Sequence, residues 1–277
     1  MATIERIEHL DDPRVAAYRD LRDATLKARE GLFVAEGRLV VRLLLEGCRY
    51  RARSVFVSDV ALAQMRDVIE AAPATIRVFV AGQGVLDGVA GFALHRGCVA
   101  LGERGDVADA EALLRDAARQ ARLIVVAHDL TNHDNMGGVF RNAAAFGAGA
   151  VLVTQRCCDP LYRKAIRVSM GHALRVPFGL IDATARGVEL MRTLGWKTVA
   201  LTPAAGAVAI GSAMKQVGRQ DKVAVFVGTE GEGLPGAVMA ACDVRVRIGM
   251  AAGVDSLNVA TASGIALQRF AEAVEAV

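Results

Sequence analysis

The sequence lacks the features that mark several specialised classes of protein. Its 277 residues contain no run of about 18 uninterrupted apolar residues, so we expect no membrane-spanning helix. The first residues show no basic stretch followed by an apolar one, so we expect no signal peptide. The five cysteines, at positions 48, 98, 157, 158 and 242, form no Cys-x-x-Cys pair and no even set. We therefore expect no zinc site, no disulfide framework and a reducing, cytoplasmic location.

Strong net charge is also missing, because 33 basic side chains face 30 acidic ones, but the basic residues are unevenly spread. Ten basic and five acidic residues lie between Arg14 and Arg53. A second surplus lies between Arg156 and Arg175, where five basic residues face one acidic residue. Arg outnumbers Lys by 28 to 5, and guanidinium groups bind phosphate oxygens well. Both segments are candidates for contact with a polyanion, and the alternative is that they are solvated helix surfaces.

The chain divides into an N-terminal and a C-terminal part of different texture. Its length suggests two domains, and the alternative is one large α/β domain. In residues 1–105, short apolar runs alternate with stretches of helical periodicity, so we expect a small α/β domain. The runs cover residues 33–34, 54–57, 77–80 and 97–101, and the helical stretches cover residues 39–45 and 60–72. Four glycines between residues 82 and 91 predict a loop. Residues 106–122 are rich in alanine with one polar face, and they predict a linker helix.

From residue 123 to residue 277 the pattern predicts a doubly wound α/β domain on a parallel sheet. Apolar, β-branched runs recur with helical stretches between them, at residues 123–127, 150–154, 174–180, 197–201, 223–228 and 244–248. Continuous rather than alternating apolar strands are typical of a sheet that helices cover on both faces. Ligands of such sheets bind beyond the carboxyl ends of the strands, so the segments that follow those ends form the candidate site.

The first of three such segments runs from Asp129 through a polar loop to Gly137 and Gly138, and then into a helix. The glycines predict either close approach of a ligand to the backbone or a tight turn between strand and helix. Arg141 is expected about one turn into the helix, with its side chain directed back toward the helix N-terminus and the strand ends. The alternative is a surface arginine that offsets nearby carboxylates.

The second segment, residues 223–235, is an apolar strand that runs directly into a loop with three glycines and two glutamates. The spacing matches neither Gly-x-Gly-x-x-Gly nor a phosphate-binding loop, and two carboxylates would repel a phosphate. A ligand with adenosine hydroxyls and a cationic centre fits this loop better. The alternative is an ordinary flexible loop.

The third segment precedes an apolar helix that we expect over residues 257–267. Asp255 or Ser256 is the expected N-cap residue of this helix. That leaves Asn258 in the first turn of a helix that is apolar on most sides, where a buried amide needs a hydrogen-bond partner. Asn258 is therefore a candidate site residue.

Taken in this order, the three segments resemble the motifs of the SpoU family of S-adenosylmethionine-dependent RNA ribose 2′-O-methyltransferases, in the SPOUT superfamily. The first motif has a Gly two residues and an Arg six residues after an Asn, and Asn135, Gly137 and Arg141 match it. The second, Gly-x-Glu-Gly-x-Gly-Leu, is matched over residues 228–234. The third, Ser-Leu-Asn-Val-Ala, is matched over residues 256–260.

The resemblance implies a trefoil-knotted SPOUT methyltransferase domain over residues 123–277, S-adenosylmethionine as cofactor, ribosomal or transfer RNA as substrate, and a homodimer. Residues 1–105 resemble, less sharply, the small ribosomal-protein-like RNA-binding domain often joined to this enzyme. The residues expected to bind the cofactor are Leu201, Thr202, Gly228, Thr229, Gly233, Ile248, Met250 and Leu257. The residues expected to contact RNA, all from the two basic segments, are Arg22, Arg29, Arg38, Tyr162 and Arg167.

The resemblance also implies five catalytic residues, Arg141, Asn135, Glu230, Ser256 and Asn258. The family's Arg is often described as the general base, but lowering a guanidinium pKa from its usual high value to about 7 would cost about 8 kcal/mol. We expect Arg141 to stay cationic, fix the adjacent phosphate and stabilise the developing alkoxide, while the proton leaves to a phosphate oxygen, water or Glu230. Asn135 is expected to orient Arg141 or the ribose, and Glu230 to organise the cofactor loop or pair with Arg141. Ser256 and Asn258 are expected to hold the active-site backbone and hydrogen-bond the ribose or the arginine.

Two other functions fit parts of the sequence. One is a non-catalytic RNA-binding protein on a decayed methyltransferase scaffold, which the intact Arg141, Glu230 and Asn258 disfavour. The other is a nucleotide-dependent oxidoreductase, which is disfavoured because no strand is followed by a glycine-rich fingerprint with a downstream ribose-binding acid. The histidines at positions 128, 133 and 172 are interpreted as structural or loop residues rather than acid–base groups.

Overall fold

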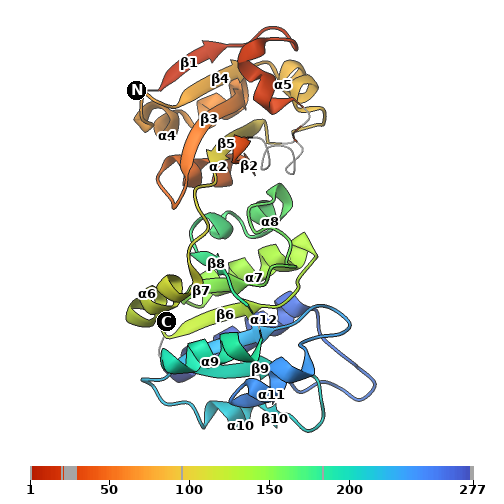
Figure 1. Cartoon of the computed structure of the whole chain (residues 1–277). Helices are drawn as coiled ribbons and strands as arrows, with labels where there is room; N and C mark the ends of the chain where they lie inside the picture. The colour runs from red at the N-terminus through yellow and green to blue at the C-terminus, as the bar shows by residue number, and fades with distance from the viewer. Residues whose placement is uncertain (1, 20, 22–29, 95, 183, 275–277) are drawn as a thin grey trace. The chain divides into compact units, whose positions relative to one another are not determined.

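The chain folds into two compact units, each with its own sheet (Figure 1). The computed structural model describes residues 2–19, 21, 30–94, 96–182 and 184–274. The first unit comprises Met1–Asp106 together with Leu161–Arg175, and the second comprises Val107–Pro160 and Val176–Val277. The sequence predicts that the first unit consists of residues 1–105 alone. The structure differs, because the chain returns to this unit over Leu161–Arg175. Local patterns do not show it, because it depends on contacts between residues far apart in the chain.

The first unit holds a mixed sheet with the strand order β1-β4-β3-β5-β2. Its strands are β1 (Thr3–Arg6), β2 (Leu32–Glu36), β3 (Arg51–Ser58), β4 (Arg77–Ala81) and β5 (Cys98–Glu103). The first, fourth and third strands are parallel, whereas β5 runs antiparallel to β3 and β2. The helical elements are η1 (Pro13–Tyr18), α2 (Arg38–Leu45), α3 (Asp59–Gln64), α4 (Arg66–Ala71), α5 (Gln83–Ala90), α8 (Arg163–Val168) and η2 (His172–Leu174). Side chains such as Val34, Phe56 and Phe79 are buried and give this unit its own core.

Two local predictions for the first unit are wrong. Of the four glycines between residues 82 and 91, Gly84 and Gly88 lie inside α5, and Gly82 and Gly91 cap its two ends, so the segment is a helix rather than a loop. Gly91 ends this helix in the left-handed region, with a φ of 79°, and a Cβ on Gly88 would lie 2.6 Å from Leu10 Cδ2, so Gly88 allows close packing. The stretch expected as one helix over residues 60–72 is two helices, α3 and α4, which meet at Met65.

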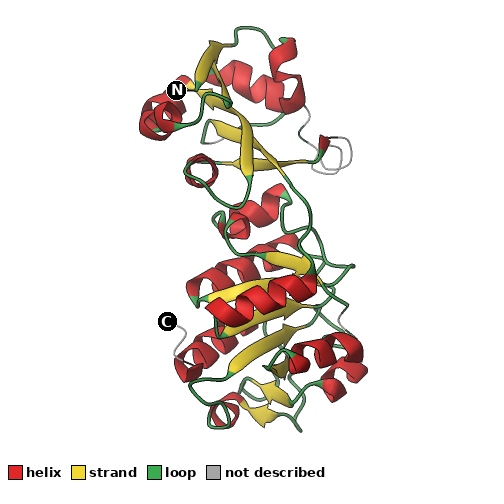
Figure 2. Cartoon of the chain, turned by 60° about the vertical axis from the view of Figure 1, so that its left-hand side comes forward, coloured by secondary structure: helices red, strands yellow, loops and turns green. Residues whose placement is uncertain are grey.

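The second unit holds a parallel sheet with the strand order β10-β12-β9-β11-β6-β7-β8. Its strands are β6 (Leu123–Ala127), β7 (Ala148–Val153), β8 (Phe178–Leu180), β9 (Trp196–Leu201), β10 (Val208–Ala209), β11 (Lys222–Val227) and β12 (Val244–Arg247). Its helices are α6 (Ala110–Gln120), α7 (His133–Ala145), α9 (Ala185–Thr193), α10 (Ile210–Met214), α11 (Gly236–Ala241) and α12 (Val259–Val274). Helices lie on both faces of the sheet (Figure 2). The predicted parallel α/β architecture is therefore confirmed.

Helix α6 is part of the second unit and not a linker. Asp109 caps its start by accepting a hydrogen bond from Ala112 N at 2.9 Å. Leu113, Leu114 and Ala117 are buried in the core that also contains Ile124 of the central strand β6. The alanine-rich pattern with one polar face is thus that of an amphipathic helix packed on a sheet.

Strand β8 begins later than the expected residues 174–180. His172–Leu174 form η2, and Pro177 stands directly before the strand. Since proline has no N–H to donate to a neighbouring strand, the apolar residues before it do not extend the ladder.

The five cysteines are free thiols. Burial raises the pKa of each of them, to about 12 for Cys158 and Cys242, so all five stay protonated at neutral pH. Within the described residues, no group of three or more His, Cys, Asp or Glu side chains is arranged to hold a metal ion. Nor does any helix in that part of the chain have the length and apolar character that a bilayer crossing requires.

Candidate functional site

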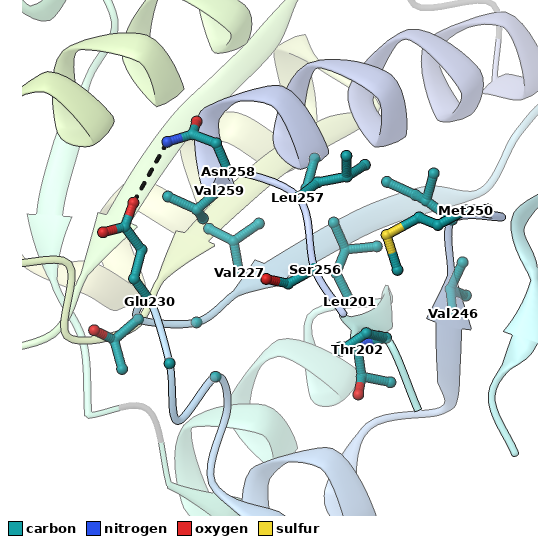
Figure 3. Close-up of a pocket in the computed structure, with 17 residues that line it drawn as sticks. Leu201, Thr202, Val227, Glu230, Val246, Met250, Ser256, Leu257, Asn258 and Val259 are labelled. Atoms are coloured by element: carbon teal, nitrogen blue, oxygen red, sulfur yellow. Dashed lines mark hydrogen bonds between the residues drawn. The ribbon is translucent and has the colours of Figure 1, made fainter. Parts of the chain in front are cut away.

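A cavity of about 340 Å³ lies in the second unit, beyond the carboxyl ends of β9, β11 and β12. Leu201, Val227 and Val246 come from these strands, and the chain before α12 supplies a further wall (Figure 3). All eight residues expected to bind the cofactor line it: Leu201, Thr202, Gly228, Thr229, Gly233, Ile248, Met250 and Leu257. The position is the one that the topology of a parallel sheet favours for a ligand.

The loop that follows β11 folds back on itself, and its glycines make this possible. A Cβ on Gly228 would lie 2.3 Å from the carbonyl carbon of Gly233 and 2.4 Å from Leu234 N. Gly233 N donates to Thr229 O at 3.0 Å, and Gly231 and Gly233 have φ values of 88° and 70°, which favour glycine. The loop is therefore a tight, hydrogen-bonded turn at the cavity wall, not an open flexible segment.

Three side chains, one from each motif segment, meet beside the cavity. Asn258 Nδ2 donates to Asn135 Oδ1 at 2.8 Å and to Glu230 Oε1 at 3.4 Å. Asn135, which is only 5% exposed, donates its own Nδ2 to Glu230 Oε1. Figure 3 shows the Glu230 carboxylate facing the Asn258 amide across the edge of the cavity. Glu230, Ser256 and Asn258 line the cavity, whereas Asn135 does not.

The N-cap of α12 is Asn258, so the expectation of Asp255 or Ser256 is wrong. The helix begins at Val259, and Asn258 Oδ1 accepts hydrogen bonds from Ala260 N at 2.9 Å and Thr261 N at 3.3 Å. The side-chain amide of Asn258 therefore lies at the start of the helix rather than inside it, and both its nitrogen and its oxygen have hydrogen-bond partners.

Arg141 does not line the cavity in this chain. Helix α7 begins earlier than expected, because Asn132 Oδ1 accepts hydrogen bonds from Asp134 N at 2.7 Å and Asn135 N at 3.4 Å. Arg141 consequently lies more than two turns into the helix rather than one, and about 240° around the axis from Asn135. Its side chain is exposed, and its guanidinium has no hydrogen bond or ion pair with any residue that the structure describes.

The two glycines of this segment lie inside α7, so they form no turn between strand and helix. A Cβ on Gly138 would lie 2.5 Å from Ala260 Cβ, so this glycine lets α7 and α12 approach closely. Asn142 holds the same pair of helices, since its Nδ2 donates to Ala260 O at 2.6 Å and to Ser263 Oγ at 3.0 Å. The close approach at Gly138 is to a neighbouring helix and not to a ligand.

The residues expected to contact RNA lie in the first unit where the structure describes them. Arg38 begins α2, Tyr162 precedes α8, and Arg167 lies on α8 with its Nη1 3.6 Å from Glu36 Oε2. Arg22 and Arg29 lie outside the described residues. Arg167 is thus partly engaged within the protein, although its side chain remains 55% exposed.

Sequence reasoning missed part of the apolar wall, namely Pro203, Val246 and Ala262. Val246 is central in a predicted strand, and Ala262 lies one helical turn after Asn258, so both follow once the strand ends and the helix start are known. The signal for these residues is the position of the site at the carboxyl ends of parallel strands, where ligands bind, and not a sequence motif.

Comparison with known proteins shows the family. Residues 122–268 match the model of the SpoU rRNA Methylase family. An uncharacterized tRNA/rRNA methyltransferase of Mycobacterium tuberculosis (strain ATCC 25618 / H37Rv) is 37% identical over 260 residues, which cover 92% of this chain and 88% of that protein. A relative of the same description from Mycobacterium bovis has the same identity and coverage.

Solved structures share the fold at low sequence identity. The AdoMet-bound rRNA methyltransferase of Sinorhizobium meliloti has a TM-score of 0.77 and 23% identity, and the match covers 97% of this chain and 98% of that one. The SpoU methyltransferase AviRb of Streptomyces viridochromogenes, in complex with AdoMet, has a TM-score of 0.76 and 21% identity over 94% of this chain and 98% of that one. By the family model, the curated relatives and the shared fold, the chain belongs to the SpoU family of RNA methyltransferases.

Proposed function

We propose that the protein transfers a methyl group from S-adenosylmethionine to a ribose 2′-hydroxyl of structured ribosomal or transfer RNA. The observation that carries this proposal is the meeting of Asn135, Glu230 and Asn258 at the edge of a mostly apolar cavity. A sugar hydroxyl at that edge would have a carboxylate and an amide beside it and an apolar chamber in front of it.

The cavity suits S-adenosylmethionine by the chemistry of its wall. Leu201, Ile248, Met250 and Leu257 supply apolar surface, and the tight loop at Gly228 presents backbone rather than side chains. A carboxylate at the rim repels a phosphate and is compatible with a cationic sulfonium. When bound, the cofactor supplies an electrophilic methyl group.

The chain's own residues then align the hydroxyl and exclude water. The apolar wall removes water from a reaction in which an oxygen nucleophile and a cationic donor give neutral products, and loss of solvation favours such a step. The partner subunit's Arg141 holds the phosphate next to the target ribose and stabilises charge on the oxygen. A homodimer is part of this proposal, because Arg141 is exposed and outside the cavity of its own chain.

The first unit is proposed to bind the RNA, through Arg38, Tyr162, Arg167 and the basic segments around them. The second unit is proposed to carry the chemistry and to contain the trefoil knot that the family resemblance implies. We propose a cytoplasmic location, because ribosomes and transfer RNA act there.

The proposal is tested by mapping 2′-O-methyl groups in total RNA from cells with and without the protein, followed by methylation of the unmodified RNA with purified protein. We expect the loss of one or a few sites in the cells and their restoration in vitro. S-adenosylmethionine should also raise the melting temperature of the protein, whereas NAD should not. An unchanged map with no transfer in vitro, despite RNA binding, would instead support the decayed-scaffold alternative.

A further inference from the structure

The hydrogen-bond accounting at the cavity edge fixes the orientation of both amides. The N–H groups of Ala260 and Thr261 require an acceptor, so the oxygen of Asn258 must face the start of α12. Its Nδ2 must then face Asn135, which has to present its oxygen there. The only polar atom that Asn135 has left is its Nδ2, and this atom faces Glu230.

Glu230 consequently receives two amide N–H groups on one oxygen, Oε1. An amide N–H needs an acceptor, and both of these N–H groups find theirs on the same carboxylate oxygen. No described residue donates a hydrogen bond to the second oxygen, Oε2, and Glu230 is an exposed residue that lines the cavity. One carboxylate oxygen is held in place, and the other is open to a ligand.

Glu230 is also the one titratable side chain among the described residues that line the cavity. The other polar side chains of the wall are hydroxyls or an amide, from Thr202, Thr229, Ser256 and Asn258. None of these groups accepts a proton near neutral pH. The site therefore contains one anchored proton acceptor, at the rim where the sugar must enter.

We propose that Glu230 is the catalytic proton acceptor and that Asn135 and Asn258 are positioning residues that present its free oxygen to the ribose. This inference rests on the proposed function. The 2′-hydroxyl proton passes to Glu230 Oε2 as an oxygen electron pair forms the bond to the methyl carbon. The electron pair of the breaking carbon–sulfur bond stays on sulfur, so the cation is neutralised, and Glu230 then releases its proton to water. Charge and protons balance without any further reactant.

The test compares Glu230→Gln with Glu232→Gln, a matched change two residues further along the same loop that does not line the cavity. We expect Glu230→Gln to lower the single-turnover rate of methyl transfer by about 10²–10⁴-fold. Its dissociation constant for S-adenosylmethionine, measured by calorimetry, should change less than about threefold, since the apolar wall and the loop backbone remain. Glu232→Gln should retain the rate and the affinity of the wild type.

Chemical rescue separates a proton acceptor from a structural carboxylate. Formate added to Glu230→Ala should restore about tenfold or more of the lost rate, because a small carboxylate can occupy the vacated space. Formate should have no effect on the wild type. Asn258→Ser keeps an oxygen to cap α12 but loses the donor to Glu230, so its kcat should fall while its KM and its cofactor affinity stay near those of the wild type.

Each outcome decides between two failures. If the wild type transfers no methyl group to ribose, both the proposed function and the role of Glu230 are wrong. If the wild type is active and Glu230→Gln keeps its rate within about threefold, only the role of Glu230 fails. A rate and a cofactor affinity that fall together, with no rescue by formate, would also overturn the role, because Glu230 would then only organise the cofactor loop.

Discussion

Gly228 stands where β11 ends and the cavity begins, and backbone atoms of the loop lie where a side chain at this position would be. A Cβ there would lie 2.3 Å from the Gly233 carbonyl carbon and 2.4 Å from Leu234 N, and backbone atoms cannot rotate away as a flexible side chain can. We therefore expect Gly228→Ala to displace the loop, to lower the free energy of unfolding by about 1–3 kcal/mol and to weaken S-adenosylmethionine binding. Thermal unfolding and calorimetric titration measure the two effects.

Gly236→Ala is the control for this change. Gly236 lies shortly after the loop, at the start of α11, and a Cβ there would meet no atom within 4 Å. Since alanine also favours a helix over glycine, this variant should bind the cofactor normally and be at least as stable as the wild type. Normal binding by Gly228→Ala would show that the loop can open without loss, and that its tight fold does not shape the cavity.

The motif residues show how far local sequence leads at this scale. The glycines and Glu230 of the second segment indicate a ligand loop by their type and spacing alone, and Leu234, which follows them, is buried as the strand-to-loop pattern suggests. Which glycine is required could not be predicted, because the answer depends on how the loop folds back onto Gly228. The same holds for Arg141, whose direction depends on where α7 begins.

At the scale of elements, Asp243 joins a helix to two strands. Asp243 stands directly before β12. Its Oδ2 accepts hydrogen bonds from the backbone N and the Oγ1 of Thr198 in β9, both at 2.7 Å. Its Oδ1 accepts a hydrogen bond from Arg192 Nη2 of α9, also at 2.7 Å. Burial, the largest single influence, raises the pKa of this carboxyl, but the hydrogen bonds from Thr198 and the Arg192 guanidinium together outweigh it and lower the pKa below its usual range.

We expect Asp243→Ala to lower the free energy of unfolding by about 1–3 kcal/mol near neutral pH. Because the folded pKa is below the unfolded value of about 3.9, the stabilisation by this carboxylate is fully present above about pH 4 and is lost as the pH falls through the folded pKa. Urea unfolding at several pH values should show the wild type and the variant converging only under acid conditions. Asp255→Ala, which removes an exposed carboxylate, should change stability little at any of them. A constant difference down to pH 2 would contradict the assigned cause.

Most strands of the second unit were predictable, whereas the two-residue strand β10, the start of β8 and the helix starts were not. Strands β6 and β7 and residues 223–227 of β11 are continuous apolar runs because helices cover both faces of the sheet, so their composition alone indicates them. Helices α7 and α12 both begin after an Asn whose side chain caps the backbone. Several polar residues lie near each start, and the sequence does not show which of them is the N-cap. These two starts decide the directions of Arg141 and Asn258, so the errors in helix boundaries fall on the site itself.

At the scale of the whole molecule, the chain passes between the two units three times, after Asp106, Pro160 and Arg175. The segment Leu161–Arg175 joins the first unit through Arg163, whose guanidinium lies 4.3 Å from the ring centre of Phe92 and 3.8 Å from Glu36 Oε2. These partners are about 70 and 130 residues away in the sequence. No periodicity connects residues so far apart, so the sequence suggests a simple two-domain order that the fold does not follow.

The exposed position of Arg141 leads to a prediction about the assembly. If the partner subunit's Arg141 completes each site, a protomer carrying Arg141→Ala and one carrying Gly228→Ala should complement each other. In their heterodimer the cofactor loop of the first protomer is intact and receives the intact arginine of the second. Random exchange of subunits from an equal mixture gives heterodimers in half of the assemblies, each with one complete site of two, so about a quarter of wild-type activity should return.

Methyl transfer by the mixture, after subunit exchange under mild denaturant and dilution, measures this recovery, and sedimentation confirms that both variants dimerise. Each variant alone, taken through the same exchange at a cofactor concentration too low to saturate Gly228→Ala, is the control and should stay far less active than the mixture. If the arginine acted on its own chain, every heterodimer would contain two incomplete sites, and no activity would return. That result would require α7 to turn Arg141 toward the cavity, and the hydrogen bonds from Asn142 of α7 to Ala260 and Ser263 of α12 oppose such a turn.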